Sequence, residues 1–362
     1  MIRFDRRLLQ NVDWLLLVPA FAVIALSFMT LWNLAPGGRH AMAWRQLTWV
    51  ALGLLALRAV VSVDYRNLVR AAPALYVGGL ALLLTVFAFG RLVAGARRWI
   101  HIGPFTFQPS ELFKLIFVLV LAWIFTARWA QPLSRGAAVG VAAVVAVPAL
   151  LIVRQPDLGT ALVLLPVLAA VLVGAGIRAR TLSRFVLAAV AAMPLVWFAL
   201  KEYQRERLLV YVDPFRDPLG TAYNVIQAKI AIGSGQLVGR GVSGATQSRL
   251  AFLPERHTDF IFAVFAETWG FVGCLVLVVA YGLLVLRGFD IAASARDPRG
   301  RVIALGVSAL FATQTLVNMG MVTGLLPVVG IPLPLMSYGG SSMLVSLMGL
   351  GLLLSVRMRQ FQ

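Results

Sequence analysis

Long apolar runs recur along the whole chain, and they limit its fold more than any other feature. A helix needs about 17 to 25 mostly apolar residues to cross the hydrocarbon layer of a membrane. Runs of this kind lie at about residues 14–34, 44–63, 71–90, 109–127, 137–153, 158–176, 184–200, 259–286, 301–323 and 335–355. No module of domain size separates them. The sequence therefore predicts an all-α polytopic membrane protein with ten transmembrane helices and a single transmembrane domain over residues 1–362.

The composition excludes an ordinary soluble domain. Hydrophobic residues make up 60% of the chain and charged residues 13%, whereas the charged share of soluble domains is about 25%. The net charge of +18 would suggest nucleic-acid binding in a soluble chain, but here the basic residues separate apolar runs and form no basic face. We therefore expect anionic lipid headgroups, and no nucleic acid, as partners.

Basic residues favour one side of the predicted membrane. If the N-terminus lies inside, the inside segments hold 17 basic residues and the short outside loops hold six, so the positive-inside rule places both termini in the cytoplasm. No cleavable signal peptide is evident, and the first run is predicted to be a signal anchor. The one long hydrophilic loop, about residues 201–258 between the seventh and eighth helices, then faces out. In this loop Val225, Ile226, Ala228 and Ile230 are compatible with a short amphipathic helix on the membrane surface.

Asp259 lies where this loop meets the eighth apolar run, and an ionisable group at such a boundary is a functional candidate. Two interpretations stay open. Thr258 or Asp259 could cap the helix, because both residue types accept hydrogen bonds from free N–H groups at a helix start. Alternatively, Phe260 and Phe262 could desolvate the carboxyl group and raise its pKa towards that of a useful general base.

Two charged pairs spaced i, i+3 also lie near the predicted outer face. Glu111 and Lys114 follow Pro109, which suits a first helical position, and the two charges are expected to neutralise each other inside the membrane. Arg154 and Asp157 lie in a tight hairpin between the fifth and sixth runs, where an ion pair is expected. All four are also candidate substrate-binding residues, because a positioned lysine or arginine can face a phosphate.

Arg97 and Arg98 go against the charge bias, because they lie in a short outside loop. Positive charges on the less favourable side of the membrane are better explained by binding of a ligand than by topology. The alternative is an arginine pair at the headgroup level, with Trp99 as an interface anchor.

The connection between the ninth and tenth runs carries several prolines and glycines. Pro327, Pro332 and Pro334 prevent a regular helix, and non-helical backbone at membrane depth is tolerated only where it is buried in protein or lines a cavity. Ser337 in this connection is a further candidate substrate-binding residue. The histidines do not stand at metal-ligand spacing, so no metal-binding residue is predicted.

Several motifs stand together in an order that is typical of one family. The chain carries RRWI, FQPSELFK, QPDLGTA, AIGSGQLVGRG, FLPERHTDFIFAVFAETWG and SYGGSS. With this set it resembles the SEDS family (shape, elongation, division and sporulation), most closely its rod-shape elongation branch. The resemblance runs from the third span to the tenth.

The resemblance implies a ten-helix peptidoglycan glycosyltransferase, inverting in its chemistry, that polymerises lipid II on the outer face of the cytoplasmic (inner) membrane. It also implies a class B penicillin-binding protein, which crosslinks the strands, and other elongation-complex membrane proteins as partners. The family's catalytic carboxylate falls on Asp259. Glu111 and Lys114 fall on positions that the family uses around its central cavity.

The chemistry of such a reaction agrees with these residues. Lipid II carries its sugar on a pyrophosphate, which departs as an anion, so the transfer needs one base and some positive charge. Asp259 is the predicted base for the 4-hydroxyl of the acceptor sugar. The candidate pyrophosphate ligands, in falling order, are Lys114, Arg97, Arg98 and Arg154. A divalent cation, Mg²⁺ or Mn²⁺, is a further expectation, and no organic cofactor is expected.

Two other functions stay open at this point. The chain could be a lipid II flippase, since ten spans with intramembrane charges and broken helices also resemble a transporter. Against that, no paired interrupted segments occur in corresponding halves of the sequence. It could instead be a scaffold for the crosslinking enzyme, in which case Asp259 would be dispensable.

Overall fold

The computed structural model describes residues 12–34, 40–93, 96–103, 105–126, 135–177, 202–213, 222–245 and 255–360, with single positions between 180 and 217. The long helices are α2 (Trp14–Asn33), α3 (Ala41–Ser62), α4 (Tyr65–Phe89), α5 (Pro109–Thr126), α6 (Arg135–Arg154), α7 (Leu158–Gly174), α13 (Ile261–Ser294), α14 (Pro298–Thr323) and α15 (Gly340–Met358). The shorter elements are β1 (Arg91–Val93), β2 (Ala96–Ile102), β3 (Phe105–Phe107), α9 (Glu202–Val212), α10 (Tyr223–Gly235) and α11 (Gly241–Gly244).

Nine of the ten predicted membrane helices are helices in the described part of the chain. Eight of them are long and apolar enough to cross a membrane, and α7 is a shorter apolar helix. The predicted seventh helix, 184–200, lies largely outside the described residues. The chain is therefore a multi-pass membrane protein, and the number ten stays a prediction.

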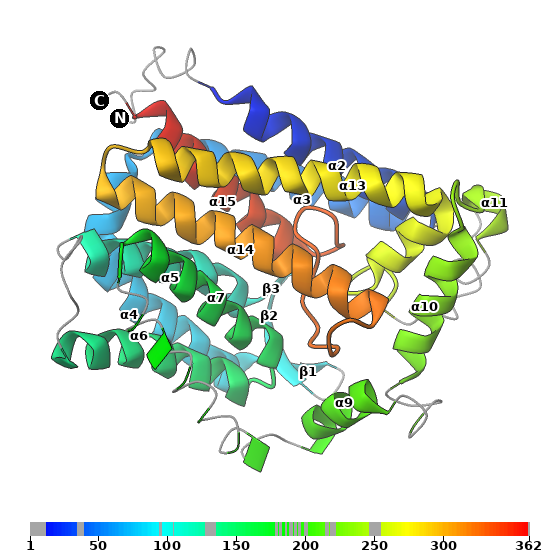
Figure 1. Ribbon diagram of the computed structural model, residues 1–362, viewed down its shortest axis with the longest axis horizontal. Helices are drawn as coiled ribbons and strands as arrows, with labels where there is room; N and C mark the ends of the chain where they lie inside the picture. The colour runs from blue at the N-terminus through cyan, green and yellow to red at the C-terminus, as the bar shows by residue number, and fades with distance from the viewer. Residues whose placement is uncertain are drawn as a thin grey trace.

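The helices run side by side, and the two ends of the bundle differ (Figure 1). Asp13, just ahead of α2, forms ion pairs with Arg287 at 2.8 Å and with Arg357 at 3.4 Å. The start of α2 and the end of α15 therefore lie together at one end. The strands, α9 and α10 lie at the other end (Figure 1). The described ends of α2 and α15 thus lie opposite the strands, α9 and α10, and the sides of the membrane that these ends face stay a prediction.

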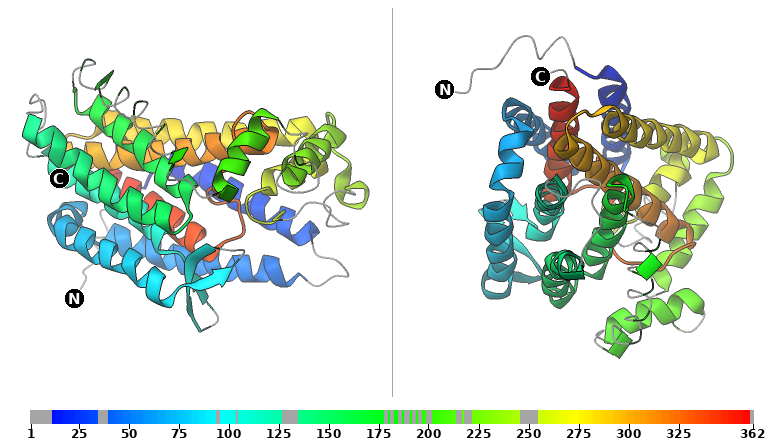
Figure 2. Two further views of the ribbon diagram at one scale, coloured as in Figure 1. Left: turned by 90° about the horizontal axis from the view of Figure 1, so that it is seen from below. Right: turned by 60° about the vertical axis from the view of Figure 1, so that its left-hand side comes forward.

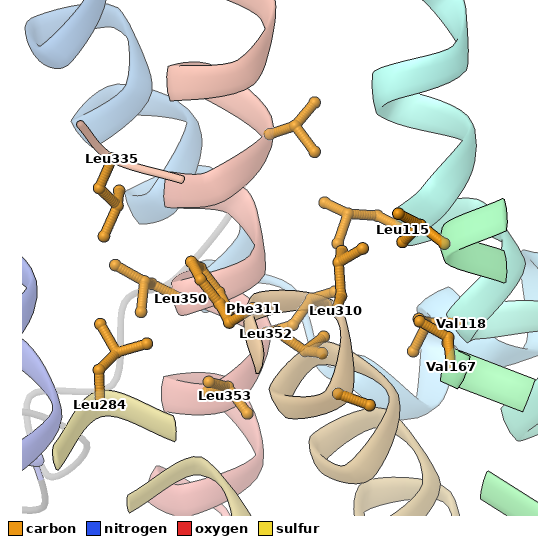
Figure 3. Close-up of a cluster of buried hydrophobic side chains, with 14 of the residues drawn as sticks. Leu115, Val118, Val167, Leu284, Leu310, Phe311, Leu335, Leu350, Leu352 and Leu353 are labelled. Atoms are coloured by element: carbon orange, nitrogen blue, oxygen red, sulfur yellow. The ribbon is translucent and has the colours of Figure 1, made fainter. Parts of the chain in front are cut away.

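Helices α5, α14 and α15 form the core of the bundle. About two thirds or more of their apolar spans are buried, whereas α3, α4 and α6 bury 22% and leave most of their length to lipid. Figure 3 shows Leu115 and Val118 of α5 in one cluster with Leu310 and Phe311 of α14 and Leu353 of α15. Both views of Figure 2 show α4 on the outside of the bundle. The central position of α5, α14 and α15 is typical of helices that are apolar all round.

Helix α13 is one apolar run in the sequence but two helices in space. Gly270 has φ 65° and ψ −163°, a conformation that only glycine adopts readily. The segment after α10 occupies the break, where Phe271 N donates to Gln236 O at 2.8 Å. A Cβ added at Gly270 would lie 2.2 Å from Gly239 N. The break lets residues 261–268, all of them buried, turn into the protein.

The all-α prediction misses a small antiparallel sheet between α4 and α5. Strand β2 pairs with β1 on one side and with β3 on the other. Strands β1 and β3 have three residues each, and the seven residues of β2, ARRWIHI, do not alternate between apolar and polar, so the sequence carries no strand pattern here. The sheet occupies the loop that carries Arg97 and Arg98.

Helix α10 confirms the predicted short helix in the long loop. It packs on α13 and α14 through the small residues Ala228, Ala231 and Gly235, while Ile230 is 46% exposed. A Cβ on Gly235 would lie 2.1 Å from the carbonyl oxygen of Ala266. Small residues let two backbones approach closely, so α10 packs on α13 and α14 through its small face; its place on the membrane surface stays a prediction.

Candidate active site

A cavity of about 650 Å³ lies at the end of the bundle that carries the sheet. Its wall is built from β2, α7, α9, the turn before α13 and the connection between α14 and α15. The charged side chains in this wall are Arg98, Arg207, Glu255 and Asp259. Segments far apart in the sequence thus converge on a space large enough for a small-molecule ligand.

Asp259 lies in the turn before α13 and does not cap that helix. The N-cap residue is Phe260, and no side chain makes a capping hydrogen bond there. The backbone around Asp259 is held instead by neighbours: Asn318 Nδ2 donates to Asp259 O at 2.9 Å, and Ser337 Oγ donates to Thr258 O at 2.7 Å. The helix-cap interpretation is therefore wrong, and the carboxyl group of Asp259 is left to the cavity.

Burial raises the pKa of Asp259 to about 6. The negative charge of Glu255 raises it further, Arg207 and Arg98 oppose the rise, and Asp157 adds a smaller increase. A carboxyl group with this pKa is mostly ionised at neutral pH and is more basic than an ordinary aspartate. Both properties suit a general base.

The connection between α14 and α15 is non-helical, as predicted, and its backbone is bonded by side chains. Its carbonyl groups accept hydrogen bonds from Ser27, Gln46, Tyr281 and Asn318. These four donors come from four different helices. The connection is therefore a fixed wall of the cavity. Ser337 is a positioning residue, because its hydrogen bond to Thr258 O holds the turn that contains Asp259.

Asp157 and Arg154 do not form the predicted ion pair. The Asp157 carboxylate accepts hydrogen bonds from Gln108 Nε2 at 2.9 Å, from Ser110 Oγ at 3.0 Å and from Thr160 N at 3.3 Å. Arg154 is exposed and lies outside the cavity wall. The spacing rule applies within one helix, but Arg154 ends α6 and Asp157 caps α7.

Arg97 and Arg98 point to opposite sides of β2, because side chains alternate along a strand. Arg98 lines the cavity and donates to the carbonyl group of Pro156. Its Nε is buried with no hydrogen-bond partner, so it still has a donor to offer. Arg97 is exposed and makes a long bond of 3.5 Å to Phe87 O.

Glu111 and Lys114 form the predicted pair in α5. Lys114 Nζ lies 2.7 Å from Glu111 Oε1, with side chains 2% and 3% exposed. Neither residue belongs to the cavity wall, which α5 approaches through Gln108, just ahead of its first residue Pro109. The structure therefore places the pair beneath the site, where it neutralises charge inside the bundle.

Two charged residues of the cavity wall were not predicted from the sequence. Arg207 lies in α9 and Glu255 in the turn before Asp259. Both belong to a highly charged loop, in which no local pattern separates a ligand-facing side chain from a solvated one. The one available signal was the presence of eight basic residues in a loop that faces the disfavoured side.

The described residues contain no group of three or more histidine, cysteine, aspartate or glutamate side chains that could hold a metal ion. Two carboxylates, Asp259 and Glu255, line the cavity. Mg²⁺ commonly takes one or two carboxylates together with substrate phosphates and water. These two side chains are therefore enough for a cation that is also bound by a substrate pyrophosphate, but too few for a cation bound by the protein alone.

Comparison with known proteins decides the family. The family model described as a cell cycle protein, which covers FtsW, RodA and SpoVE, matches residues 6–362. The chain belongs to this family. The peptidoglycan glycosyltransferase MrdB of Escherichia coli K12 is 41% identical over 347 residues, which cover 96% of this chain and 93% of MrdB. The SEDS resemblance is thereby confirmed.

Solved structures of this family show the same fold. The rod shape determining protein RodA of Thermus thermophilus has 34% sequence identity and a TM-score of 0.73, over 97% of this chain and 98% of RodA. A chain from a peptidoglycan synthase complex that coordinates polymerization and crosslinking has 39% identity and a TM-score of 0.83, over 97% and 99% of the two chains.

Proposed function

We propose that Asp259 is the general base with which this peptidoglycan glycosyltransferase extends a glycan strand from lipid II. One observation carries the proposal: a partly buried carboxyl group with a pKa of about 6 lines a cavity that also holds two arginines. Its backbone is fixed by Asn318, and its side chain is not used as a helix cap.

The reaction is a single displacement at the anomeric carbon of the donor sugar. The 4-hydroxyl oxygen of the acceptor forms the new bond to that carbon, and the bond from the carbon to the pyrophosphate oxygen breaks. The electron pair leaves with the pyrophosphate, and the hydroxyl proton passes to Asp259. A single displacement inverts the configuration at the anomeric carbon. A positioned general base contributes about 10²- to 10⁴-fold to the rate of such a step.

Arg98 and Arg207 supply positive charge for the departing pyrophosphate. Both line the same cavity as Asp259, and the fork of a guanidinium group matches two phosphate oxygens. A divalent cation bound with the substrate would add to this charge; Glu255 would be its protein ligand, and Asp259 would stay available to accept the proton. Lys114 was the first candidate pyrophosphate ligand from the sequence. It forms an ion pair with Glu111 and lies behind the cavity wall, so it does not contact the pyrophosphate directly in this proposal.

The active site belongs on the outer face of the cytoplasmic membrane. The cavity lies at the end of the bundle opposite the cluster of Asp13, Arg287 and Arg357, and the predicted inside segments hold 17 basic residues against six in the short outside loops. The partner that we infer is a class B penicillin-binding protein, because a similar chain stands in a peptidoglycan synthase complex.

Strand extension in detergent separates polymerisation from lipid transport, because no membrane with two sides is present. Purified protein with its class B partner is supplied with lipid II, and wild type is compared with Asp259→Asn and Asp290→Asn. Asp290 is a matched control, since it is an exposed aspartate at the opposite end, paired with Arg287. We expect long glycan strands from wild type and Asp290→Asn, and none from Asp259→Asn. Strands formed by Asp259→Asn at near wild-type rate would refute the proposal.

A further inference from the structure

A second cavity, of about 270 Å³, lies at the opposite end of the protein from the active site. It is enclosed by the start of α4, the connection between α13 and α14 and the residues that follow α15. Its charged lining consists of Arg66, Arg296, Arg359 and one carboxylate, Asp297. We propose that this cavity binds a phosphate group, carried either by a phospholipid headgroup or by a soluble phosphate ester.

Arg359 is the strongest reason for an anion. Its side chain is buried, with 6% exposed, and its guanidinium group donates only to neutral acceptors, Ser355 Oγ at 2.7 Å and Val61 O at 2.8 Å. Among the described residues, no carboxylate lies within ion-pair distance of it. Buried charges in proteins are normally paired. Burial also lowers the pKa of Arg359, so a bound anion would stabilise its charged form.

Asp297 does not supply the missing charge, because its carboxylate already serves other groups. It accepts hydrogen bonds from Arg66 Nε at 3.1 Å and from Tyr65 Oη at 3.3 Å, and it caps α14 through Arg299 N at 2.9 Å. The nearby Asp64 caps α4 and lies outside the lining. Its charge opposes the effect of burial on the pKa of Arg359 but does not reverse it. The charged lining of the cavity therefore consists of three guanidinium groups and one carboxylate, and Arg66 forms an ion pair with that carboxylate.

The size and position of the cavity suit a phosphate. A water molecule occupies about 30 Å³ of liquid, so 270 Å³ has room for a phosphate group and several waters. Arginine forks match phosphate oxygens in pairs. The cavity lies at the helix ends, where lipid headgroups meet a membrane protein, and on the side that the charge bias places in the cytoplasm, where anionic lipids attract arginine.

Thermal unfolding of the purified protein in detergent tests this site. A ligand that joins α4, α14 and α15 should raise the Tm in a saturable way. The probes are inorganic phosphate and a short-chain phosphatidylglycerol, compared with a phosphatidylcholine of equal chain length and with sodium chloride at matched ionic strength. A rise with phosphate alone identifies a soluble ester as the natural source, and a rise with phosphatidylglycerol alone identifies a headgroup. No saturable rise with either would overturn the proposal.

Variants locate the binding. We expect Arg66→Gln and Arg359→Lys to raise the half-saturating concentration on the order of tenfold, because each loses a charge-assisted fork. Arg70→Gln is the control on the same helix: Arg70 is exposed and lies outside the lining. Asp297→Asn keeps a capping side chain but removes the negative charge, so it should lower that concentration. If Arg359→Lys does not fold, the other two variants decide the question, because Arg66→Gln should raise the half-saturating concentration and Asp297→Asn should lower it. The same half-saturating concentration in both variants would refute the site.

Discussion

Replacing Arg207 with glutamine should move the pH dependence of strand extension. The base must be deprotonated to act, so activity rises with pH through the pKa of Asp259, about 6 in the wild-type protein. Arg207 favours the charged carboxylate and lowers this pKa. Without Arg207 the pKa rises, and the acidic limb of the rate profile moves to higher pH. Glu255→Gln should move the limb to lower pH, because Glu255 raises the pKa.

The size of the shift follows from the geometry. A point at the Cβ position of Gly330 lies 3.4 Å from Asp259 Oδ2 and 3.8 Å from Arg207 Nη1, so the two atoms are at most about 7 Å apart. Two charges at that separation interact by about 2 kcal/mol at an effective dielectric constant of about 20. Water in the open cavity screens part of this energy, which leaves a shift of about one pH unit, or about 1.4 kcal/mol.

The assay is the initial rate of strand extension from pH 5 to 8 at saturating lipid II. Arg205→Gln is the matched control, since Arg205 lies on the same helix and donates to the carbonyl groups of Trp197 and Phe198. The midpoint of the limb should lie near pH 7 for Arg207→Gln and near pH 6 for wild type and Arg205→Gln, as expected for a shift of about one unit. If Arg207→Gln lowers the rate equally at every pH, the electrostatic argument is wrong.

Two further predictions concern stability. Glu111→Gln leaves Lys114 buried without a counter-ion and should cost about 3 to 5 kcal/mol; the Tm should fall, and Lys114→Met in the same chain should restore most of it. Gly270→Ala places a Cβ against backbone at a positive φ and should cost about 1 to 3 kcal/mol or more. The control is Gly282→Ala in the same helix, where no atom lies within 4 Å of the added carbon, so its Tm should not fall. A Gly270→Ala protein with the wild-type Tm would contradict the account of the helix break.

The membrane helices were predictable because lipid imposes a simple rule on the sequence. A span must be apolar over a fixed length and must bond its backbone internally, so the apolar runs mark α2 to α7 and α13 to α15. Local chemistry also placed some ends correctly. Pro109 begins α5, and the predicted hairpin at residues 154–157 separates α6 from α7.

The failures share a cause, because each depends on contacts between distant segments. The break at Gly270 interrupts no apolar pattern, and it exists because Gln236 and its neighbours bond to the freed backbone. From the sequence, Arg97 ranked ahead of Arg98 as a candidate ligand, whereas strand β2 turns Arg98 into the cavity and leaves Arg97 exposed. Arg207 carries no local signal, and only the position of α9 brings it to Asp259.

The most direct test of the central claim separates binding from chemistry in Asp259→Asn. The affinity for lipid II and the single-turnover rate of strand extension are measured on the same folded preparation. If Asp259 is the general base, the affinity stays near that of wild type and the rate falls by about 10²- to 10⁴-fold. A rate close to wild type, or a loss of affinity as large as the loss of rate, would show that Asp259 does not act as the base.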